Sequence, residues 1–242
     1  MERVAVVTGG SRGIGRAIAV KLAAAGNAVV VGYAGNAALA GEVVTEITAA
    51  GGRAVAAQAD VADEKQVAAM FDLAQERFGG VDAVVNSAGV MTLAPIADLD
   101  LEALDEMWRT NVRGTFVVSR EAARRLRDGG SVVTMSTSVT ALQMPTYAGY
   151  AASKAAVEAA TLIFARELRG RDITVNTVAP GPTDTSFFTD GKDAETIARM
   201  AKQPPLERLG TPADAAELVT FLVSPQGHWV NGQTIRSNGG II

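Results

Sequence analysis

The chain has 242 residues, of which 48% are hydrophobic and 20% are charged. A chain this long and this apolar buries a sizeable core, which excludes a disordered protein. Lys and Arg number 22 against 26 Asp and Glu, a formal net charge of −4, so the basic surplus typical of nucleic-acid-binding proteins is missing. The chain has no cysteine, which excludes a disulfide framework, a thiolate nucleophile and a cysteine-ligated zinc site.

Several further classes of protein are not expected. No stretch approaches the roughly 20 uninterrupted apolar residues of a membrane-spanning helix, so no membrane segment is predicted. No targeting segment is visible, and the lack of cysteine fits a cytoplasmic protein. Asp and Glu residues show no metal-ligand spacing, so no catalytic metal is predicted.

Short β-branched runs alternate with longer Ala-rich stretches along almost the whole chain. The runs are nearly continuous in hydrophobicity, which is typical of parallel strands covered on both faces. The longer stretches carry apolar residues at helical spacing. The predicted elements are, in chain order, strand 4–7, helix 14–25, strand 28–31, helix 37–50, strand 54–57, helix 64–78, strand 83–85, helix 101–126 with a break, strand 131–134, helix 150–168 and strand 173–176.

Repeated strand–helix–strand units of this kind predict a doubly wound α/β sheet with helices on both faces. No linker or shift in composition divides the chain, so a single domain over residues 1–242 is expected. Pro and Gly punctuate residues 180–210, while Phe187, Phe188 and Met200 give this stretch an apolar side. We expect a mobile lid at about 183–205, with an ordinary surface excursion as the alternative.

A glycine-rich turn follows the first predicted strand and leads into the first helix. It reads Thr8-Gly9-Gly10-Ser11-Arg12-Gly13-Ile14-Gly15, with the spacing G-x-x-x-G-x-G. In this order of elements, backbone N–H groups and a positive helix N-terminus lie where a phosphate can bind, and the glycines permit its close approach. The turn therefore predicts a nucleotide-phosphate site rather than tight packing alone.

The residues after the second predicted strand indicate which dinucleotide is bound. That strand continues into Gly32-Tyr33-Ala34-Gly35-Asn36, without an acid to bind the adenosine ribose and repel a 2′-phosphate. Arg12 supplies a cation and Asn36 an amide near the same place, which favours NADP(H) over NAD. The alternative is a solvated Arg12 and an Asn36 that caps a helix. Asp60, followed by Val61, is either an acceptor for the adenine amino group or a helix cap near Asp63.

Tyr150 and Lys154 place a phenol and an ammonium four residues apart, on one face of the predicted helix 150–168. A cation close to a phenol stabilises the phenolate and lowers the tyrosine pKa, which makes the tyrosine a general acid/base near neutral pH. The hydroxyl-rich segment Ser136-Thr137-Ser138 ends the fifth predicted strand, where α/β sheets present groups that contact ligands. Together these residues predict a proton-transfer site.

In order and spacing, these pieces resemble the short-chain dehydrogenase/reductase family, and the resemblance covers essentially the whole chain. It implies a Rossmann-type fold with a central parallel sheet of about seven strands, and an NADP(H)-dependent oxidoreductase that acts on the CH–OH group of an alcohol or on a carbonyl. It also implies a homotetramer or dimer, formed through the helices near 101–126 and 150–168. The matching pieces are the turn at 8–15, Asp60-Val61, Asn86-Ser87-Ala88-Gly89, Asn111, the Ser/Tyr/Lys set and Pro180-Gly181.

The resemblance also implies a role for each matched residue. Tyr150 is expected to give the proton to the carbonyl, Ser138 to hydrogen-bond the carbonyl oxygen, and Lys154 to hold the nicotinamide ribose and tune Tyr150. Asn111 is expected to position a water between Lys154 and solvent. The implied cofactor-binding residues are Gly9, Ser11, Arg12, Gly13, Ile14, Gly15, Tyr33, Asn36, Asp60, Val61, Asn86, Ala88, Gly89, Tyr150, Lys154, Pro180, Gly181, Thr183 and Thr185.

Two positions depart from the family pattern. Ser87 replaces the second asparagine of Asn-Asn-Ala-Gly, which should weaken a local set of hydrogen bonds more than the chemistry. Ser138 lies twelve positions before Tyr150, whereas the family's serine lies thirteen before, where this chain has Thr137. We prefer Ser138, because Ser138-Val139 matches the family's serine and small apolar residue if one residue is lost from the following loop. Thr137 stays an alternative, and Ser136 a weaker one.

The sequence thus predicts an NADP(H)-dependent carbonyl reductase or alcohol dehydrogenase with a small-molecule substrate. A free carbonyl compound is slightly favoured over a carrier-bound β-ketoacyl thioester, although the chain as a whole resembles 3-oxoacyl-carrier-protein reductases. Arg127, Arg169 and Arg171 are the candidates for docking an acidic carrier beside the site. A dehydratase or epimerase is not excluded. A catalytically silent NADP-binding regulator or scaffold is the alternative from another class, but such a protein has no need for the intact catalytic set.

Overall fold

The computed structural model describes residues 2–242, which form a seven-stranded sheet in the order β3-β2-β1-β4-β5-β6-β7. Every pair of neighbouring strands is parallel, which confirms the predicted Rossmann-type α/β fold. The strands are β1 (Arg3–Thr8), β2 (Asn27–Tyr33), β3 (Arg53–Gln58), β4 (Val81–Asn86), β5 (Leu126–Met135), β6 (Thr174–Pro180) and β7 (Thr234–Ser237).

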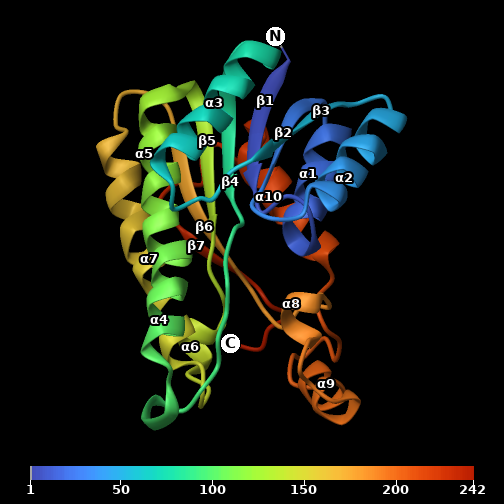
Figure 1. Ribbon diagram of the computed structural model, residues 1–242, viewed down its shortest axis with the longest axis vertical. Coiled ribbons are helices and arrows are strands. Elements are labelled where there is room, and N and C mark those ends of the chain that lie inside the picture. Colours follow the sequence, from blue (N-terminus) through green and yellow to red (C-terminus); the bar gives the residue numbers. More distant parts are fainter. Residues whose placement is uncertain (1) are drawn as a thin grey trace.

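Helices cover both faces of the sheet (Figure 1). One face packs against α1 (Gly13–Ala24), α2 (Ala37–Ala49) and α10 (Pro212–Val223). The other face packs against α3 (Glu64–Phe78), α5 (Gly114–Arg125) and α7 (Ala148–Glu167).

Strand β1 shows why the predicted strands are apolar throughout. Val4 and Val6 pack into the core under α3, α5 and α7, whereas Val7 and its neighbour Ala5 pack into the core under α1, α2 and α10. Successive side chains of a strand point to opposite faces, so a strand with two buried faces has no solvated position and is mostly apolar. The same pattern makes β2 buried from Asn27 to Gly32.

The predicted helix 101–126 is interrupted as expected. It consists of α4 (Leu101–Trp108), a π-helical turn over Arg109–Arg113, and α5. The turn contains Asn111, whose side chain is fully buried. A π-helical turn inserts one extra residue into a helix, and such turns are frequent at functional sites.

Strand β7 and helix α10 are among the elements after β6 that were not predicted from the sequence. Helix α10 begins with a capping box, because the Thr211 hydroxyl accepts a hydrogen bond from the Asp214 backbone and the Asp214 carboxylate accepts one from the Thr211 backbone. Pro212 is its first residue. Thr-Pro-x-Asp before an apolar stretch is a helix start signal, so the sequence did contain the information. The shorter helical segments are η1 (Ile96–Asp98), α6 (Val139–Leu142), α8 (Ser186–Thr189), α9 (Ala194–Ala201) and η3 (Pro225–Gly227).

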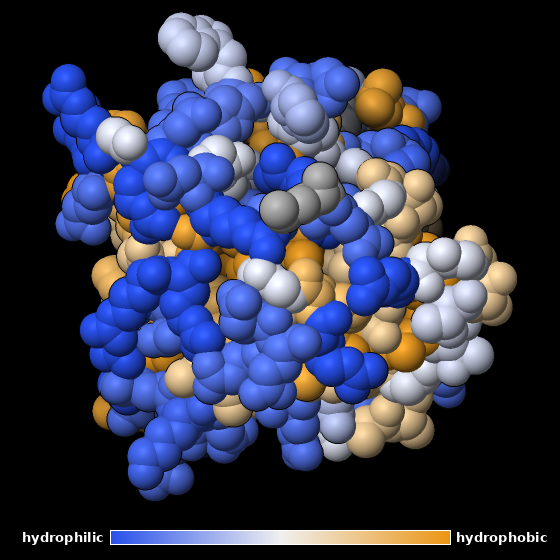
Figure 2. Space-filling model, turned by 90° about the horizontal axis from the view of Figure 1, so that it is seen from above, coloured by the Kyte–Doolittle hydropathy of each residue, from blue (hydrophilic) through white to orange (hydrophobic). Residues whose placement is uncertain are grey.

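The two ends of the sheet differ. Helices α6, α8 and α9 lie at the carboxyl ends of the strands, at the bottom of Figure 1. Figure 2 looks onto the opposite end, where the chain begins, and that end is largely hydrophilic. Over the described residues, none of the helices combines the length and the hydropathy that crossing a membrane requires.

Candidate active site at the carboxyl ends of the strands

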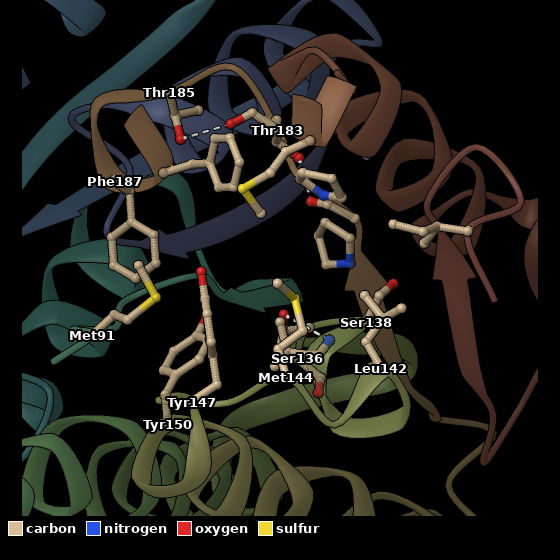
Figure 3. A pocket seen from close by; sticks show the side chains of 18 of the residues that line it. Met91, Ser136, Ser138, Leu142, Met144, Tyr147, Tyr150, Thr183, Thr185 and Phe187 are labelled. Carbon is tan, nitrogen blue, oxygen red and sulfur yellow. Dashed lines mark hydrogen bonds between the residues drawn. The ribbon is translucent and has the colours of Figure 1, made fainter. Parts of the chain in front are cut away.

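A pocket opens at the carboxyl ends of β5 and β6, where the chain passes from sheet to helix (Figure 3). Its walls come from the segment after β5, the start of α7, the segment after β6, and α8 and α9. Its lining includes no charged residue. The lining residues are Ile14, Met91, Ser136, Thr137, Ser138, Val139, Leu142, Met144, Tyr147, Tyr150, Pro180, Gly181, Pro182, Thr183, Thr185, Phe187, Phe188, Met200, Gln203 and Ile241.

Helix α7 brings Tyr150 to the lining of this pocket and places Lys154 one turn further along the helix. Both are nearly fully buried, with exposed fractions of 6% and 5%. The Lys154 ammonium donates to the Met135 carbonyl oxygen at 2.9 Å and lies 6.0 Å from the centre of the Tyr150 ring. Burial without a carboxylate partner lowers the pKa of Lys154 to about 8.

The expected lowering of the Tyr150 pKa is wrong. Burial raises the pKa of Tyr150 above its ordinary value, and a hydrogen bond with the Thr137 side chain opposes this rise only in part. The physical reason is that the Lys154 ammonium is directed to the Met135 carbonyl instead of the phenol. The phenol therefore holds its proton at neutral pH.

The three hydroxyls after β5 have different partners. Ser136 donates to the Glu158 carboxylate at 2.5 Å. Ser138 donates to the Ala179 carbonyl at 3.1 Å and accepts from the Asn238 amide at 3.1 Å. Thr137 accepts from the Val139 backbone N–H at 3.3 Å, and its side chain is the one of the three that opposes the rise of the Tyr150 pKa.

Glu158 is a contributor that the sequence reading missed. Its carboxylate accepts hydrogen bonds from Ser136 and from Thr140 at 3.0 Å, and so ties the segment after β5 to α7. Tyr150, Lys154 and Glu158 recur at intervals of four residues, which places them on one face of the helix. This spacing was the signal that could have revealed Glu158.

Asn111 lies near Lys154 and is held by hydrogen bonds to the Val90 backbone and to the Ser153 side chain. Its amide oxygen accepts from the Val90 backbone N–H, and its amide nitrogen donates to the Val90 carbonyl, each at 2.9 Å. The same nitrogen donates to the Ser153 hydroxyl at 3.0 Å. A Cβ on Gly89 would lie 3.2 Å from the Asn111 amide oxygen and 3.3 Å from the Lys154 ammonium, so the glycine leaves room for both groups.

Asn86, at the end of β4, connects three elements rather than opening toward the pocket. Its amide accepts from the Thr8 hydroxyl at 2.6 Å and donates to the Thr115 hydroxyl at 2.8 Å. Thr115 in turn donates to the Asn111 carbonyl at 2.7 Å, and the Ala88 backbone donates to Thr8 at 3.2 Å. This buried chain of hydrogen bonds fixes the π-helical turn against the ends of β1 and β4.

In the glycine-rich turn, Gly9 and Gly15 allow close packing of the backbone, whereas Gly13 adopts a left-handed conformation. A Cβ on Gly15 would lie 2.1 Å from the Gly9 carbonyl, and one on Gly9 would lie 2.9 Å from the Ala88 backbone, so both are required by packing. Gly13 has φ +55°, and a Cβ on Gly13 would contact only the Thr185 side chain, whose methyl would lie 3.6 Å away. No acid stands in the first turn of α1, and no side chain caps its N-terminus, so the N–H groups there are left for an anion.

The two residues expected to select NADP(H) differ in their surroundings. The Arg12 side chain is exposed, makes no capping hydrogen bond, and has no acidic partner within residues 2–242. Asn36 caps α2, because its side-chain oxygen accepts from the Leu39 backbone N–H at 3.1 Å, which matches the alternative interpretation of that residue. Tyr33, at the end of β2, is half-buried.

Asp60 is already engaged on both of its carboxylate oxygens. One accepts from the Ala62 backbone N–H at 2.9 Å, and the other forms an ion pair with Arg109 at 2.5 Å. The residue that caps α3 is Asp63, not Asp60. Val61 is buried against Gly114 at the start of α5.

The segment after β6 closes the pocket opposite α7. The Ser138 backbone donates to the Pro180 carbonyl at 2.8 Å, and a Cβ on Gly181 would lie 2.9 Å from the Asn238 backbone. The Thr183 hydroxyl donates to the Gly181 carbonyl at 3.0 Å, and that of Thr185 to the Thr183 carbonyl at 3.4 Å (Figure 3).

Comparison with known proteins places this chain in a family. The family model described as enoyl-(acyl carrier protein) reductase matches residues 9–242. A short-chain type dehydrogenase/reductase of Picea abies is 46% identical over 98% of this chain and 92% of that protein. An NADPH-dependent aldehyde reductase-like protein, chloroplastic, of Arabidopsis thaliana is 44% identical over 99% of this chain and 94% of that protein.

The fold of this chain matches that of a solved structure over nearly its whole length. The short-chain dehydrogenase of Burkholderia cenocepacia J2315, in complex with NADP, is 41% identical, covers 99% of this chain and 97% of its own, and has a TM-score of 0.92. Fold and site together are those of an oxidoreductase. The chain belongs to the short-chain dehydrogenase/reductase family.

Proposed function

We propose that this protein is an NADPH-dependent carbonyl reductase that acts on free, uncharged aldehydes or ketones, and that Tyr150 gives the proton. The observation that carries the proposal is the buried pair of Tyr150 and Lys154 at a pocket without a charged lining residue. The relatives support it, because one of them is an NADPH-dependent aldehyde reductase-like protein.

The residues present suit NADP(H). The uncapped N-terminus of α1 suits the pyrophosphate, and the exposed, unpaired Arg12 suits a 2′-phosphate at a strand end that has no acid. Thr183, Thr185 and Ile14 line the side of the pocket where the nicotinamide would bind, and Lys154 would hold its ribose. When bound, NADPH supplies the hydride.

The chain's own residues move the proton. The Tyr150 phenol, kept protonated by its burial, donates its proton to the carbonyl oxygen as charge develops there. Thr137 faces this phenol, so its hydroxyl is better placed than that of Ser138 to bind the same oxygen. Lys154 and Asn111, which both border Gly89, would return a proton to Tyr150 from solvent through a bound water.

The carrier-bound thioester is disfavoured by the position of its docking candidates. Arg127 stands at the start of β5, and Arg171 precedes the start of β6, so both lie at the amino ends of the strands. Strand β5 from Leu126 to Thr134 pairs along Val81 to Asn86 of β4, which separates Arg127 from the pocket end of the sheet by roughly 17 Å. Arg127 is also paired with Asp82, and Arg171 with Asp128.

The decisive experiment is a substrate panel with NADPH oxidation as the readout. It includes aliphatic and aromatic aldehydes and ketones, β-ketoacyl thioesters with and without a carrier protein, and sugars. We expect the uncharged, apolar carbonyl compounds to give the highest kcat/KM. A preference for the carrier-bound thioester, or the absence of NADPH oxidation with every compound, would contradict the proposal.

We also propose that copies of the chain associate through α4, α5 and α7. Their outer surfaces expose large apolar residues, among them Phe116 at 54% and Ile163 at 58%. Light scattering of the wild type should show an oligomer, and Phe116→Asp combined with Ile163→Asp should shift it to the monomer.

Residues 183–205, which contain α8 and α9, are proposed as a lid whose amide exchange slows when NADPH binds.

A further inference from the structure

The hydrogen-bond partners of the pocket's hydroxyls are informative, because buried polar groups normally have one. Six of the seven lining hydroxyls have a partner within the described chain. The seventh, on Tyr147, has none. The six partnered groups belong to Ser136, Thr137, Ser138, Tyr150, Thr183 and Thr185.

The Tyr147 hydroxyl is not sealed in the core but borders the pocket, where a ligand can reach it. Tyr147 is 8% exposed, and it packs with Tyr150 and Met107 in one apolar cluster. It immediately precedes α7, so it stands three residues before the proposed proton donor. Both tyrosine side chains project into the pocket, on the side of Met91 and Phe187 (Figure 3).

We infer that the Tyr147 hydroxyl is a specificity-determining group, which binds a second oxygen of the substrate while the first is reduced at Tyr150. The inference rests on the proposed carbonyl reduction, since the same pocket is used. The substrate class that follows is an apolar carbonyl compound with a further carbonyl or hydroxyl oxygen nearby, such as a diketone or a hydroxyketone.

The chemistry of the pocket sets the form of that oxygen. Burial raises the pKa of Tyr147, so its phenol stays protonated and offers a donor. No cation lines the pocket, so the oxygen that accepts this bond is neutral. Tyr147 stands three residues before Tyr150 and both side chains enter the same side of the pocket, so the two substrate oxygens belong to nearby functional groups (Figure 3).

The test compares two ketones of one shape, 1-phenyl-1-propanone and 1-phenyl-1,2-propanedione, in the wild type and in Tyr147→Phe. Each variant is compared with the wild type on the same substrate, so the greater intrinsic reactivity of the dione cancels. We expect KM for the dione to rise about 2- to 13-fold, the worth of one neutral hydrogen bond. We expect KM for the monoketone and both kcat values to change less than about twofold.

Met144→Leu serves as the matched control, because it alters the apolar lining without touching a polar group and should shift both substrates together. The inference is overturned if Tyr147→Phe shifts both ketones equally, shifts neither, or lowers kcat instead of raising KM.

Binding of the two ketones to the protein loaded with NADP⁺, measured by calorimetry, gives the same comparison without turnover. If neither ketone is reduced, the proposed function fails, while this calorimetric comparison still decides the role of Tyr147. Dione binding that is weakened in Tyr147→Phe supports that role, and unchanged binding refutes it.

Discussion

Both ends of the sheet contain paired charges, but only the carboxyl ends combine a pocket with a buried lysine and polar side chains without a partner in the described chain. At the amino ends, charged side chains meet partners of opposite charge, as Arg127 does with Asp82 and Arg171 with Asp128. At the carboxyl ends, Lys154 is buried against a carbonyl, and the Arg12 and Tyr147 side chains have no partner within residues 2–242. Polar groups that a fold leaves unsatisfied beside a pocket are available to a ligand, and the pocket bordered by Tyr147 and Tyr150 lies at the carboxyl ends.

The largest expected effect comes from removing the phenol at the carboxyl end. Tyr150→Phe keeps the shape of the ring but removes the transferable proton, so kcat should fall about 10²- to 10⁴-fold. NADPH affinity, measured by fluorescence titration, should stay within a factor of three. Near-normal turnover in this variant would show that the proton comes from elsewhere.

The next effect separates two adjacent hydroxyls. Thr137→Val removes the group that faces Tyr150 and should lower kcat about 10²-fold, as the loss of an oxyanion donor does. Ser138→Ala removes a hydroxyl bound to the Ala179 carbonyl, and should cost about 1 kcal/mol of unfolding free energy with a smaller loss of kcat. The reverse ranking in single-turnover rates would assign the carbonyl-binding role to Ser138.

The third effect concerns Arg12, whose side chain has no partner within residues 2–242. Arg12→Ala should weaken NADPH binding by about one to two decades, because a charge-assisted contact to the 2′-phosphate is lost, and should leave NADH binding nearly unchanged. Titration of both cofactors against both proteins measures this. Equal losses for NADPH and NADH would place the 2′-phosphate away from Arg12.

Lys154 makes stability depend on pH. Its pKa is lowered to about 8 in the folded chain, against about 10.4 in an unfolded one. Between these values the unfolded chain binds more protons, so the free energy of unfolding rises with pH. From pH 8 to 10, the wild type should gain about 2 kcal/mol relative to Lys154→Met in urea titrations. A parallel pH dependence in the two proteins would mean that Lys154 titrates normally.

The smallest effect is expected at the amino end. Arg127→Glu breaks a pair with Asp82 and should lower stability, yet kcat/KM for free carbonyl compounds should change less than twofold. With a carrier-bound thioester as substrate, Arg127→Glu should likewise leave kcat/KM and its dependence on salt concentration unchanged. A large, salt-sensitive loss with the carrier alone would show that this end of the sheet does take part in function.

The sequence by itself determined the architecture, because its information is local. Apolar runs such as Val4 to Val7 predict strands buried on both faces, and the glycine-rich turn between strand and helix predicts the phosphate site. The spacing of Tyr150 and Lys154 likewise places both on one face of a helix. Helix α10 was within reach too, since its capping box is written in residues 211–214.

Only the tertiary structure decided how the side chains of the site are paired. Ser138 and Thr137 are adjacent in sequence, and nothing local tells which hydroxyl faces Tyr150, because the answer depends on Ala179 and Asn238 from other segments. The pKa of Tyr150 likewise depends on burial by the whole fold. Tyr147 became informative only when every neighbouring hydroxyl had been given a partner, and partners are contributed by residues that are distant in sequence and adjacent in space.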